Sequence, residues 1–319
     1  MNGRRWIGVT AALLLTAPSG PALAQDQALD EMTILLDWFV NPDHAPLVVA
    51  RERGFFSDFG LDVTLVAPAD PNDPPKLVAA GQAEVAVSYQ PQLHFLVNEE
   101  IPLAWVGTLV ATPLNSMLVR VDSGIESVAD LAGKKIGYSV GGVEEALVSV
   151  MLARHGLSLD DVEMINVNFS LAPALMSGQV DAVIGAYRNF ELTQMEIEGV
   201  PGRPFHVEEE GVPSYDELIY LAHPDFAGDP RLDRFLQAIT ASTQYLINHP
   251  EESWEMFVAA YPELDDELNR RAWIDTIPRF ALSPAALDRG RYRRFADFLA
   301  EQGLIDPPPP LESYTIVTD

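Results

Sequence analysis

Strand-like and helix-like segments alternate along most of this chain, and this alternation limits its fold more than any other feature. Residues 33–36 predict a strand, residues 45–53 a helix ended by Gly54, and residues 62–66 a second strand. Such alternation favours an α/β fold, with a largely parallel sheet and helices on both of its faces. The pattern continues with a helix predicted at 75–80 and strands predicted at 84–88, 105–109 and 117–121.

One sequence unit occurs twice, about a hundred residues apart. Residues 77–89 and residues 174–187 each combine a helix end, a glycine stop, a buried strand and a final tyrosine, Tyr89 or Tyr187. In open α/β sheets, ligands bind beyond the carboxyl ends of the strands. The two units therefore indicate two lobes that each present an aromatic ring to a shared cleft, although a repeat this short also arises by coincidence.

The order of segments predicts that the chain crosses between the two lobes twice. We expect a first lobe at 25–121 and 214–305 and a second lobe at 122–213. Paired crossings of this kind form a hinge. Four prolines, 307 to 310, mark residues 306–319 as an extended C-terminal tail. The remaining expected elements are helices at 127–131 and 143–155, strands at 134–138, 162–167 and 216–222, and mainly helical sequence from 230 to 302.

The first 24 residues have the pattern of a cleaved signal peptide. Arg4 and Arg5 precede an apolar stretch at 7–15, and small residues at 22–24 form a cleavage signal. The apolar stretch is too short to span a bilayer. The chain has no cysteine, which excludes a lipidated cysteine anchor, disulfides, a thiolate metal site and a cysteine nucleophile. We therefore expect a monomeric protein, free in the bacterial periplasm and without a stable membrane anchor, that begins at Gln25.

The chain is strongly acidic, with 47 acidic residues against 20 basic residues and a formal net charge of −27. Nucleic acids and anionic lipid surfaces both bind to cationic surfaces. The composition therefore indicates no nucleic-acid partner. It does not identify a ligand, because a high negative charge also serves solubility alone.

The densest group of recognition residues directly follows the first predicted strand, at residues 37–46. It contains Asp37, Trp38, Asn41 and His44, and two prolines prevent regular structure from continuing. A buried strand that ends in polar and aromatic residues is typical of a ligand crevice in α/β proteins. The alternative is a turn with a tryptophan in the core.

Other candidates lie at equivalent positions along the chain. Gly141 and Gly142 precede a predicted helix, where exposed backbone N–H groups suit a polar ligand, although a simple turn has the same pattern. Flat aromatic walls favour a ring-shaped ligand, and carboxylates accept hydrogen bonds from amino groups. The full set of candidate ligand-binding residues is Asp37, Trp38, Asn41, His44, Tyr89, Tyr138, Ser139, Gly141, Gly142, Tyr187, Asn189, Glu191 and Tyr215. Further acids at these strand ends, expected to be mostly surface residues, are Asp43, Glu144, Glu145, Asp216 and Glu217.

No catalytic or metal-binding motif stands out. The six histidines are scattered, without the spacing of a zinc site, and no nucleophile elbow, Walker loop or dinucleotide fingerprint occurs. We therefore predict neither catalytic residues, nor a metal, nor a cofactor.

Several motifs together resemble the pyrimidine-binding periplasmic proteins of thiamine-precursor ABC transporters, whose family also contains the fungal hydroxymethylpyrimidine phosphate synthases. Asn-Pro-Asp-His-Ala-Pro at 41–46 is the most specific of these motifs, and residues 68–76, 88–92 and 187–191 add to it. The resemblance extends from about residue 32 to residue 305. It implies a type II periplasmic binding fold, with two α/β lobes joined by a two-stranded hinge. It also implies an ABC permease partner and a ligand such as formylaminopyrimidine or hydroxymethylpyrimidine, stacked on Trp38, Tyr89 and Tyr187 with Glu191 accepting its amino group.

The resemblance to the synthases fails at the residues that carry their chemistry. Those enzymes use a lysine that holds pyridoxal phosphate and a cysteine-rich iron motif, whereas here Ser88 stands at the expected lysine position and residues 212–218 replace the cysteines. The hypotheses are therefore a solute-binding protein for an aminopyrimidine, a binder of another solute such as a sulfonate, nitrate or a riboflavin-like ring, and, third, a pyrimidine-processing enzyme. A sulfonate or nitrate site should show basic residues at the strand ends, and few occur there.

Overall fold

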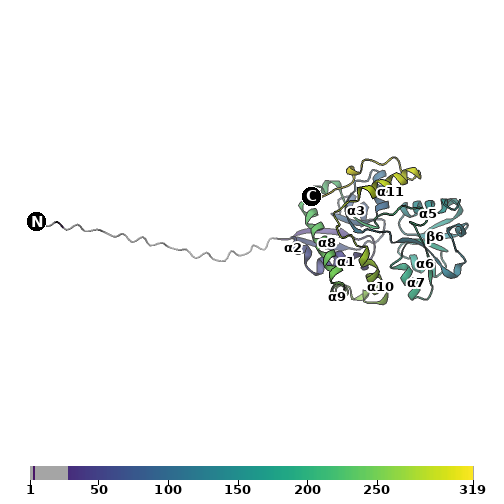
Figure 1. Ribbon diagram of the computed structural model, residues 1–319, viewed down its shortest axis with the longest axis horizontal. Helices are drawn as coiled ribbons and strands as arrows, with labels where there is room; N and C mark the ends of the chain where they lie inside the picture. Colours follow the sequence, from purple (N-terminus) through teal and green to yellow (C-terminus); the bar gives the residue numbers. More distant parts are fainter. Residues whose placement is uncertain (1–2, 4–27, 319) are drawn as a thin grey trace.

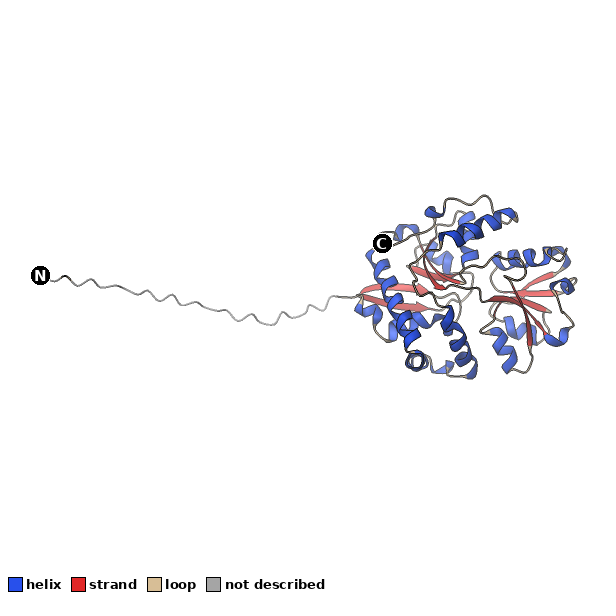
Figure 2. Ribbon diagram, in the orientation of Figure 1, coloured by secondary structure: helices blue, strands red, loops and turns tan. Residues whose placement is uncertain are grey.

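Two separate β-sheets, each covered by helices, form the protein (Figure 1 and Figure 2). The computed structural model describes Gly3 and residues 28–318. Apart from Gly3, the expected signal peptide lies outside the described residues. The two-sheet arrangement confirms the predicted α/β class, and we call the two halves the first lobe and the second lobe.

The first lobe is built on a five-stranded sheet with the order β2-β1-β3-β10-β4. β1 pairs in parallel with β2 and β3, whereas β10 is antiparallel to both of its neighbours. Its central strands are buried on both faces and are therefore almost wholly apolar. The bounds are β1 Asp30–Leu35, β2 Leu61–Val66, β3 Val85–Ser88, β4 Ala104–Val110 and β10 Leu218–Ala222.

The second lobe repeats this architecture with the order β7-β6-β8-β5-β9. Here β6 pairs in parallel with β7 and β8, and β5 is antiparallel to β8 and β9. In both lobes the inserted antiparallel strand, β10 or β5, is the first strand after a crossing between the lobes. The bounds are β5 Asn115–Arg120, β6 Lys135–Tyr138, β7 Glu163–Asn166, β8 Ala182–Tyr187 and β9 Gly202–His206.

Helices cover both faces of each sheet (Figure 2). Several begin at a proline in the first turn, where the missing N–H has no cost and the fixed φ suits the helix. The bounds are α1 Ala45–Glu52, α2 Phe55–Asp58, α3 Pro74–Ala79, α4 Gln90–Asn98, α5 Val143–Ala153, α6 Leu171–Met176, α7 Glu191–Ile197, α8 Pro230–Asn248, α9 Pro250–Ala260, α10 Glu267–Thr276 and α11 Arg289–Glu301. Among residues 28–318, no helix is both long and apolar enough to cross a membrane.

The chain crosses between the lobes at 111–114, after β4, and returns at 207–217, before β10. The strand predicted at 117–121 was placed in the first lobe, but the observed strand β5 pairs with β8 and β9 of the second. The physical reason is that Met117 and Val119 are buried in the apolar core of the second lobe. The predicted boundary at residue 121 therefore falls one strand too late.

The C-terminal region joins the lobes rather than extending away from them. Phe295 and Leu299 of α11, which was assigned to the first lobe, pack in the core cluster of the second. The tail predicted at 306–319 returns to β4, where Trp105 N donates to Tyr314 O over 3.0 Å and Ile316 N donates to Trp105 O over 2.8 Å. Burial of Leu311 and Tyr314 against the first lobe explains why the segment packs.

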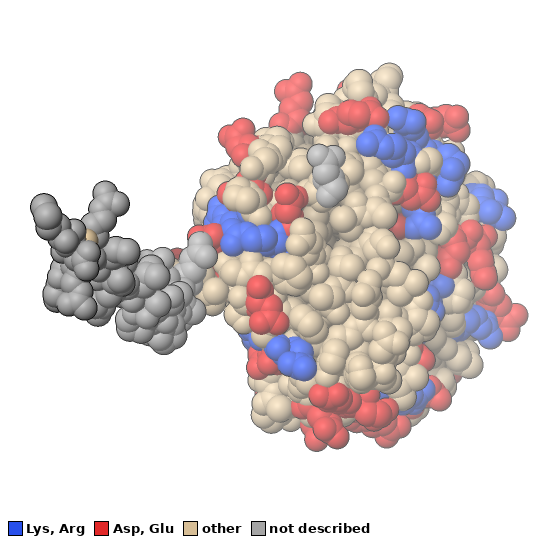
Figure 3. All heavy atoms as spheres, turned by 60° about the vertical axis from the view of Figure 1, so that its left-hand side comes forward, with Lys and Arg blue, Asp and Glu red and all other residues tan. Residues whose placement is uncertain are grey.

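Acidic side chains surround the face that Figure 3 draws, whereas uncharged residues form most of its centre. The basic side chains on this face lie close to acidic ones. The negative charge is thus spread around the edge of this face and does not form one continuous patch at its centre.

Candidate functional site

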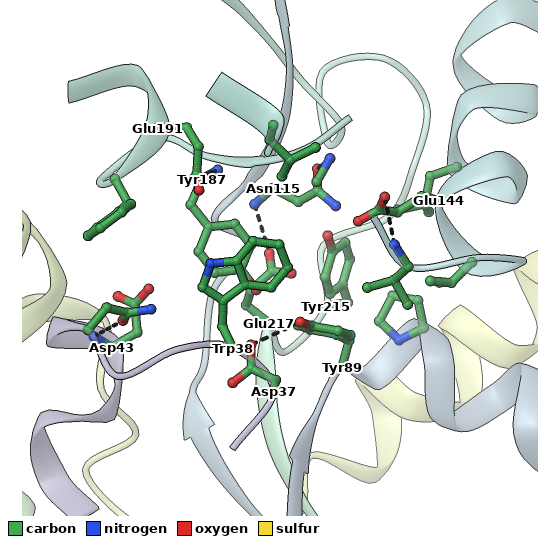
Figure 4. Close-up of a pocket in the computed structure, with 18 of the residues that line it drawn as sticks. Asp37, Trp38, Asp43, Tyr89, Asn115, Glu144, Tyr187, Glu191, Tyr215 and Glu217 are labelled. Carbon is green, nitrogen blue, oxygen red and sulfur yellow. Dashed lines mark hydrogen bonds between the residues drawn. The ribbon is translucent and has the colours of Figure 1, made fainter. Parts of the chain in front are cut away.

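A pocket lies between the two lobes and is lined by residues from both (Figure 4). First-lobe side chains enter it from the segment after β1 and from Tyr89 after β3, and second-lobe side chains enter it from α5 and from β8. Eight of the candidate residues lie in its lining: Asp37, Trp38, Asn41, His44, Tyr89, Tyr187, Glu191 and Tyr215.

The segment after β1 is held rigid by its own polar side chains. Asn41 Oδ1 accepts from Asp43 N over 2.8 Å, and the Nδ1 atom of His44 accepts from Asn41 N over 3.3 Å. The remaining ring nitrogen of His44 therefore carries the proton and donates to Asp37 Oδ1 over 2.9 Å. Tyr89 OH donates to Asp37 Oδ2 over 2.9 Å. Asp37 thus positions His44 and Tyr89, and both of its oxygens are engaged.

Aromatic rings form the walls of the pocket. In Figure 4 the indole of Trp38 lies in front of Tyr187, with Tyr89 and Tyr215 beside it. The Trp38 indole packs edge-on against Phe169 of the second lobe, with 4.6 Å between ring centroids. Trp38 Nε1 and Tyr187 OH are buried and have no hydrogen-bond partner within the described chain. Buried polar groups of this kind normally have a partner, so both atoms are available to a ligand.

Glu144, on the first turn of α5, reaches back to the backbone before its own helix. Its Oε2 accepts from Ser139 N over 2.7 Å and from Val140 N over 3.2 Å. Its Oε1 lies against Gly185, where a Cβ would overlap the carboxyl group. Gly185 has a φ of +88°, and it is therefore required for its backbone conformation as well as for the room it leaves.

Two further glutamates are buried in the pocket wall. Glu191 Oε2 accepts from Tyr187 N over 2.7 Å, and Glu217 Oε2 accepts from Asn115 N over 2.9 Å. Glu217 lies on the return crossing and Asn115 begins β5, so this carboxylate ties the two crossings together. Burial raises the pKa of Glu144 to about 8 and the pKa of Glu191 and of Glu217 to about 7.

Asp43 joins the lobes at one side of the pocket. Asn189 Nδ2 of the second lobe donates to Asp43 Oδ1 over 2.7 Å, and Thr276 Oγ1 of α10 donates to the same atom over 2.9 Å. The other oxygen of Asp43 is buried and without a partner in the described residues. Burial raises the pKa of this carboxyl above its ordinary value.

Asn72 joins the lobes at the other side. Its Oδ1 accepts from Gly141 N over 2.9 Å, and its Nδ2 donates to Ser139 O over 3.2 Å. Asp70 Oδ1 holds the Asn72 side chain by accepting from its Nδ2 over 2.8 Å. The structure is therefore that of a closed cleft.

Five candidate residues do not lie in the pocket lining. The N–H of Gly141, expected to face a ligand, is taken by Asn72, and that of Gly142 by Glu145. The two backbone N–H groups that were expected to bind a ligand therefore donate to side chains of the protein instead. The five residues outside the lining are Tyr138, Ser139, Gly141, Gly142 and Asn189.

The sequence missed part of the lining because burial of an acid depends on distant packing. Glu144 and Glu217 were grouped with surface acids, yet they are only 6% and 2% exposed. For Glu144 a local signal existed, since an acid on the first turn after Gly141-Gly142 can cap the preceding backbone. The lining residues outside the candidate set are Asp43, Pro91, Asn115, Val140, Val143, Glu144, Leu147, Leu171, Gly185, Phe190 and Glu217.

The lining contains five carboxylic side chains and no lysine or arginine. The arginine just after β8, Arg188, is instead engaged outside it, because it forms a two-point ion pair with Glu208 and donates to Leu114 O. A fully ionised ligand such as a sulfonate would find no opposite charge on these walls.

The residues present do not fit pyridoxal phosphate. No lysine lies in the lining, so no amine is available there to hold the aldehyde. Ser88, at the position expected for that lysine, is buried and donates to Gln92 Oε1 over 2.6 Å. Within residues 28–318, no cluster of three or more histidine or acidic side chains has the arrangement of a metal site.

Two α/β lobes, two crossings and a pocket between them define the periplasmic binding protein fold. A solved structure with this fold, the alkanesulfonate-binding protein of Xanthomonas axonopodis pv. citri, superposes with a TM-score of 0.70 at 19% identity. The match covers 92% of this chain and 100% of the other. At this identity it establishes the fold alone.

The chain belongs to the NMT1/THI5-like family, whose pattern matches residues 41–253. It is 47% identical over 313 residues to a putative thiamine biosynthesis protein of Haemophilus influenzae, covering 98% of each chain. It is 31% identical to the formylaminopyrimidine-binding protein of Halalkalibacterium halodurans, covering 79% of this chain and 77% of the other. A 4-amino-5-hydroxymethyl-2-methylpyrimidine phosphate synthase of Aspergillus parasiticus is 27% identical, covering 76% and 74%. The family assignment made from the motifs is thereby confirmed.

Proposed function

We propose that this protein is the solute-binding component of an ABC importer and captures an aminopyrimidine precursor of thiamine in the interlobe pocket. The observation that carries the proposal is a pocket with aromatic walls, five carboxylic side chains and no lysine or arginine. An aminopyrimidine offers a flat ring for stacking and amino N–H groups for carboxyl oxygens. The relative that binds formylaminopyrimidine supports this ligand class.

Two residues carry the recognition of the ring and of its amino group. Trp38 provides a broad apolar face on one wall. Glu191 is fixed through Oε2 by the backbone of Tyr187, and its Oε1 accepts no hydrogen bond from the described residues. That oxygen is the acceptor for the exocyclic amino group.

The test is calorimetric titration of the purified protein with formylaminopyrimidine, with hydroxymethylpyrimidine and with the sulfonate buffer MOPS. We expect binding of at least one pyrimidine and no heat with MOPS. At about pH 8, where Glu191 is mainly ionised, Glu191→Gln should weaken pyrimidine binding about tenfold or more, because a hydrogen bond to a charged group contributes about 1.5–3 kcal/mol. Glu198→Gln, an exposed position just beyond the same helix, is the matched control and should bind as the wild type does.

A second variant tests the stacking wall. Trp38→Ala should abolish detectable pyrimidine binding, whereas Tyr138→Phe, at a candidate position outside the lining, should leave it unchanged. Binding of MOPS in preference to both pyrimidines would overturn the ligand assignment. Turnover of the pyrimidine by the wild-type protein would favour the enzyme alternative.

The importer role requires export and a membrane partner. We propose cleavage after Ala24, periplasmic localisation, a monomeric state and docking of the closed protein on an ABC permease. Mass spectrometry of protein from the periplasmic fraction should give a chain that begins at Gln25. A chain retaining Arg4 and Arg5 in the cytoplasmic fraction would contradict this route.

A further inference from the structure

The pKa of Glu144 in the pocket wall is raised to about 8, above the values of about 7 for Glu191 and Glu217, and this rise results chiefly from burial. No positive charge of the lining offsets that burial, because the lining has no lysine or arginine. At neutral pH its carboxyl group therefore holds a proton. The titratable groups around it, from every element that borders this part of the pocket, are Asp37, Tyr89, Tyr138, Glu145, Tyr187, Tyr215 and Glu217.

The hydrogen bonds of Glu144 decide which of its oxygens carries that proton. Oε2 accepts two backbone N–H groups, from Ser139 and Val140, and is therefore the carbonyl oxygen of the acid. The hydroxyl is then Oε1–H. This oxygen accepts no hydrogen bond from the described residues and lies against Gly185, itself part of the lining. The pocket thus presents a carboxylic O–H donor as well as carboxylate acceptors.

We propose that Glu144 binds the ligand as a neutral carboxylic acid and donates a hydrogen bond from Oε1–H to a ring nitrogen lone pair. The inference rests on the proposed function and narrows its ligand class to an uncharged heterocycle that pairs a lone-pair nitrogen with an N–H donor. One proton then lies between Glu144 and the ring nitrogen in the complex. An ionised Glu144 would place a negative oxygen against that lone pair, so the complex must keep the proton.

The proton makes binding depend on pH in one direction. Below the pKa of Glu144 the proton is already in place, and affinity does not change with its titration. Above that pKa each binding event must take up a proton from solution, and the Kd rises about tenfold for each pH unit. Glu191 and Glu217 have a pKa near 7, so their titration also changes the Kd at lower pH. A variant of Glu144 is needed to separate its effect on the Kd from theirs.

The test is titration of the wild-type protein with the pyrimidine it binds, at about pH 6.5, 7.5, 8.5 and 9.5, with the two alkaline points measured in borate and in ethanolamine, which both buffer there. The two buffers differ in ionisation enthalpy, so the difference in heat gives the number of protons taken up. We expect a Kd that rises steeply above about pH 8 and an uptake that approaches one proton for each ligand at about pH 9.

Glu144→Gln supplies the decisive variant. The amide donates from one end and accepts from the other in the same shape, but it does not titrate. Its Kd should stay within about threefold of the wild-type value at pH 6.5 and should lose the alkaline rise. Glu145→Gln is the matched control, since Glu145 lies next along α5 and outside the lining. It should keep the alkaline rise, shifted slightly to lower pH because the charge of Glu145 contributes to the raised pKa of Glu144.

The outcomes are distinguishable. Absence of pyrimidine binding at every pH overturns the proposed function together with this inference. Binding with a constant Kd up to about pH 9.5 overturns this inference alone, as does an alkaline rise that persists in Glu144→Gln. If that variant does not fold, the proton uptake of the wild type at about pH 9 decides, and a value near zero overturns the inference.

Discussion

Gly185 and Glu144 depend on each other, because the carboxyl of one occupies the space that a side chain on the other would need. Gly185 also has a φ of +88°, where other residues are strained. The packing of Glu144 therefore requires a glycine inside β8, although glycine within a strand otherwise weakens a sheet.

Gly185→Ala should both destabilise the protein and weaken binding. The added Cβ forces the Glu144 carboxyl away from Ser139 N and Val140 N, and we expect a loss of about 2 kcal/mol or more in the free energy of unfolding. Denaturant unfolding and calorimetric titration measure the two effects.

Gly133→Ala is the control for backbone strain alone. Gly133 has a similar φ of +72°, and a Cβ there meets no atom within 4 Å. It should lose about 1 kcal/mol and keep the wild-type Kd. Equal effects of the two substitutions on the Kd would show that the contact with Glu144 is irrelevant to binding.

At the scale of elements, hydrogen bonds between the lobes hold the cleft closed on both of its sides. Asn72 reaches the loop before α5, and Asp43 reaches Asn189 just before α7. Both of these second-lobe segments directly follow a parallel strand of its sheet. The residues that hold the cleft closed and the residues that line the pocket thus lie at the same ends of the strands.

Asn72→Ala should favour the open form. Removal of two hydrogen bonds between lobes, each contributing about 0.5–1.5 kcal/mol, should weaken ligand binding about fivefold to 150-fold. We expect most of the change in the dissociation rate, measured by stopped-flow fluorescence, since the bonds exist only once the cleft has closed. Asp73→Ala, an exposed neighbour whose side chain forms no cap, should match the wild type. An unchanged dissociation rate in Asn72→Ala would contradict the proposal that Asn72 holds the cleft closed.

Sequence pattern predicts the regular elements of this chain well where apolar periodicity and glycine stops coincide. The helix predicted at 143–155 is α5 (Val143–Ala153), and the strand predicted at 33–36 is β1 (Asp30–Leu35). β9 (Gly202–His206) was missed, because its half-exposed residues and Pro204 lack the apolar signal of a buried strand. As an edge strand it tolerates both features.

The site was only partly predictable for a different physical reason. Aromatic residues at or just beyond the end of a buried strand, such as Tyr187 and Trp38, are positioned by local sequence and could be proposed as pocket walls. Whether an acid is solvated or enclosed depends on contacts between segments far apart, as for Glu217 on the return crossing and Leu114 on the outward one. A single sequence with 47 acids does not distinguish these cases.

For the whole molecule, buried carboxyl groups set how stability varies with pH. In Glu144 the pKa is raised from 4.5 to about 8, and in Glu191 and Glu217 to about 7. At a pH between 4.5 and the raised pKa of one of these groups, that group is mostly protonated in the folded state and mostly ionised in the unfolded state. The free energy of unfolding therefore falls as pH rises from about 4.5 towards 8, and each group contributes to the decline only up to its own folded pKa.

Thermal unfolding of the ligand-free protein should accordingly show a higher Tm at about pH 5 than at about pH 8. Glu144→Gln removes one of the titrating groups and should reduce the slope, most clearly between about pH 7 and 8. Glu145→Gln should retain the wild-type slope and so control for the general repulsion of an acidic surface. A Tm that rises between pH 5 and 8 would contradict the assignment of buried, protonated acids.

The return of the C-terminal segment to β4 has a consequence for aggregation. β4 is the last strand of its sheet, and its outer backbone groups would otherwise be a template for another chain. The two hydrogen bonds of Trp105 with Tyr314 and Ile316 occupy part of that edge. Truncation after Pro310 should expose the edge at Trp105, while residues 279–284 still cover it from Thr108 to Ala111. We expect this truncation to produce oligomers detectable by light scattering, whereas truncation after Val317 should leave a monomer. The segment after the four prolines thus keeps another chain from pairing with this part of the sheet edge.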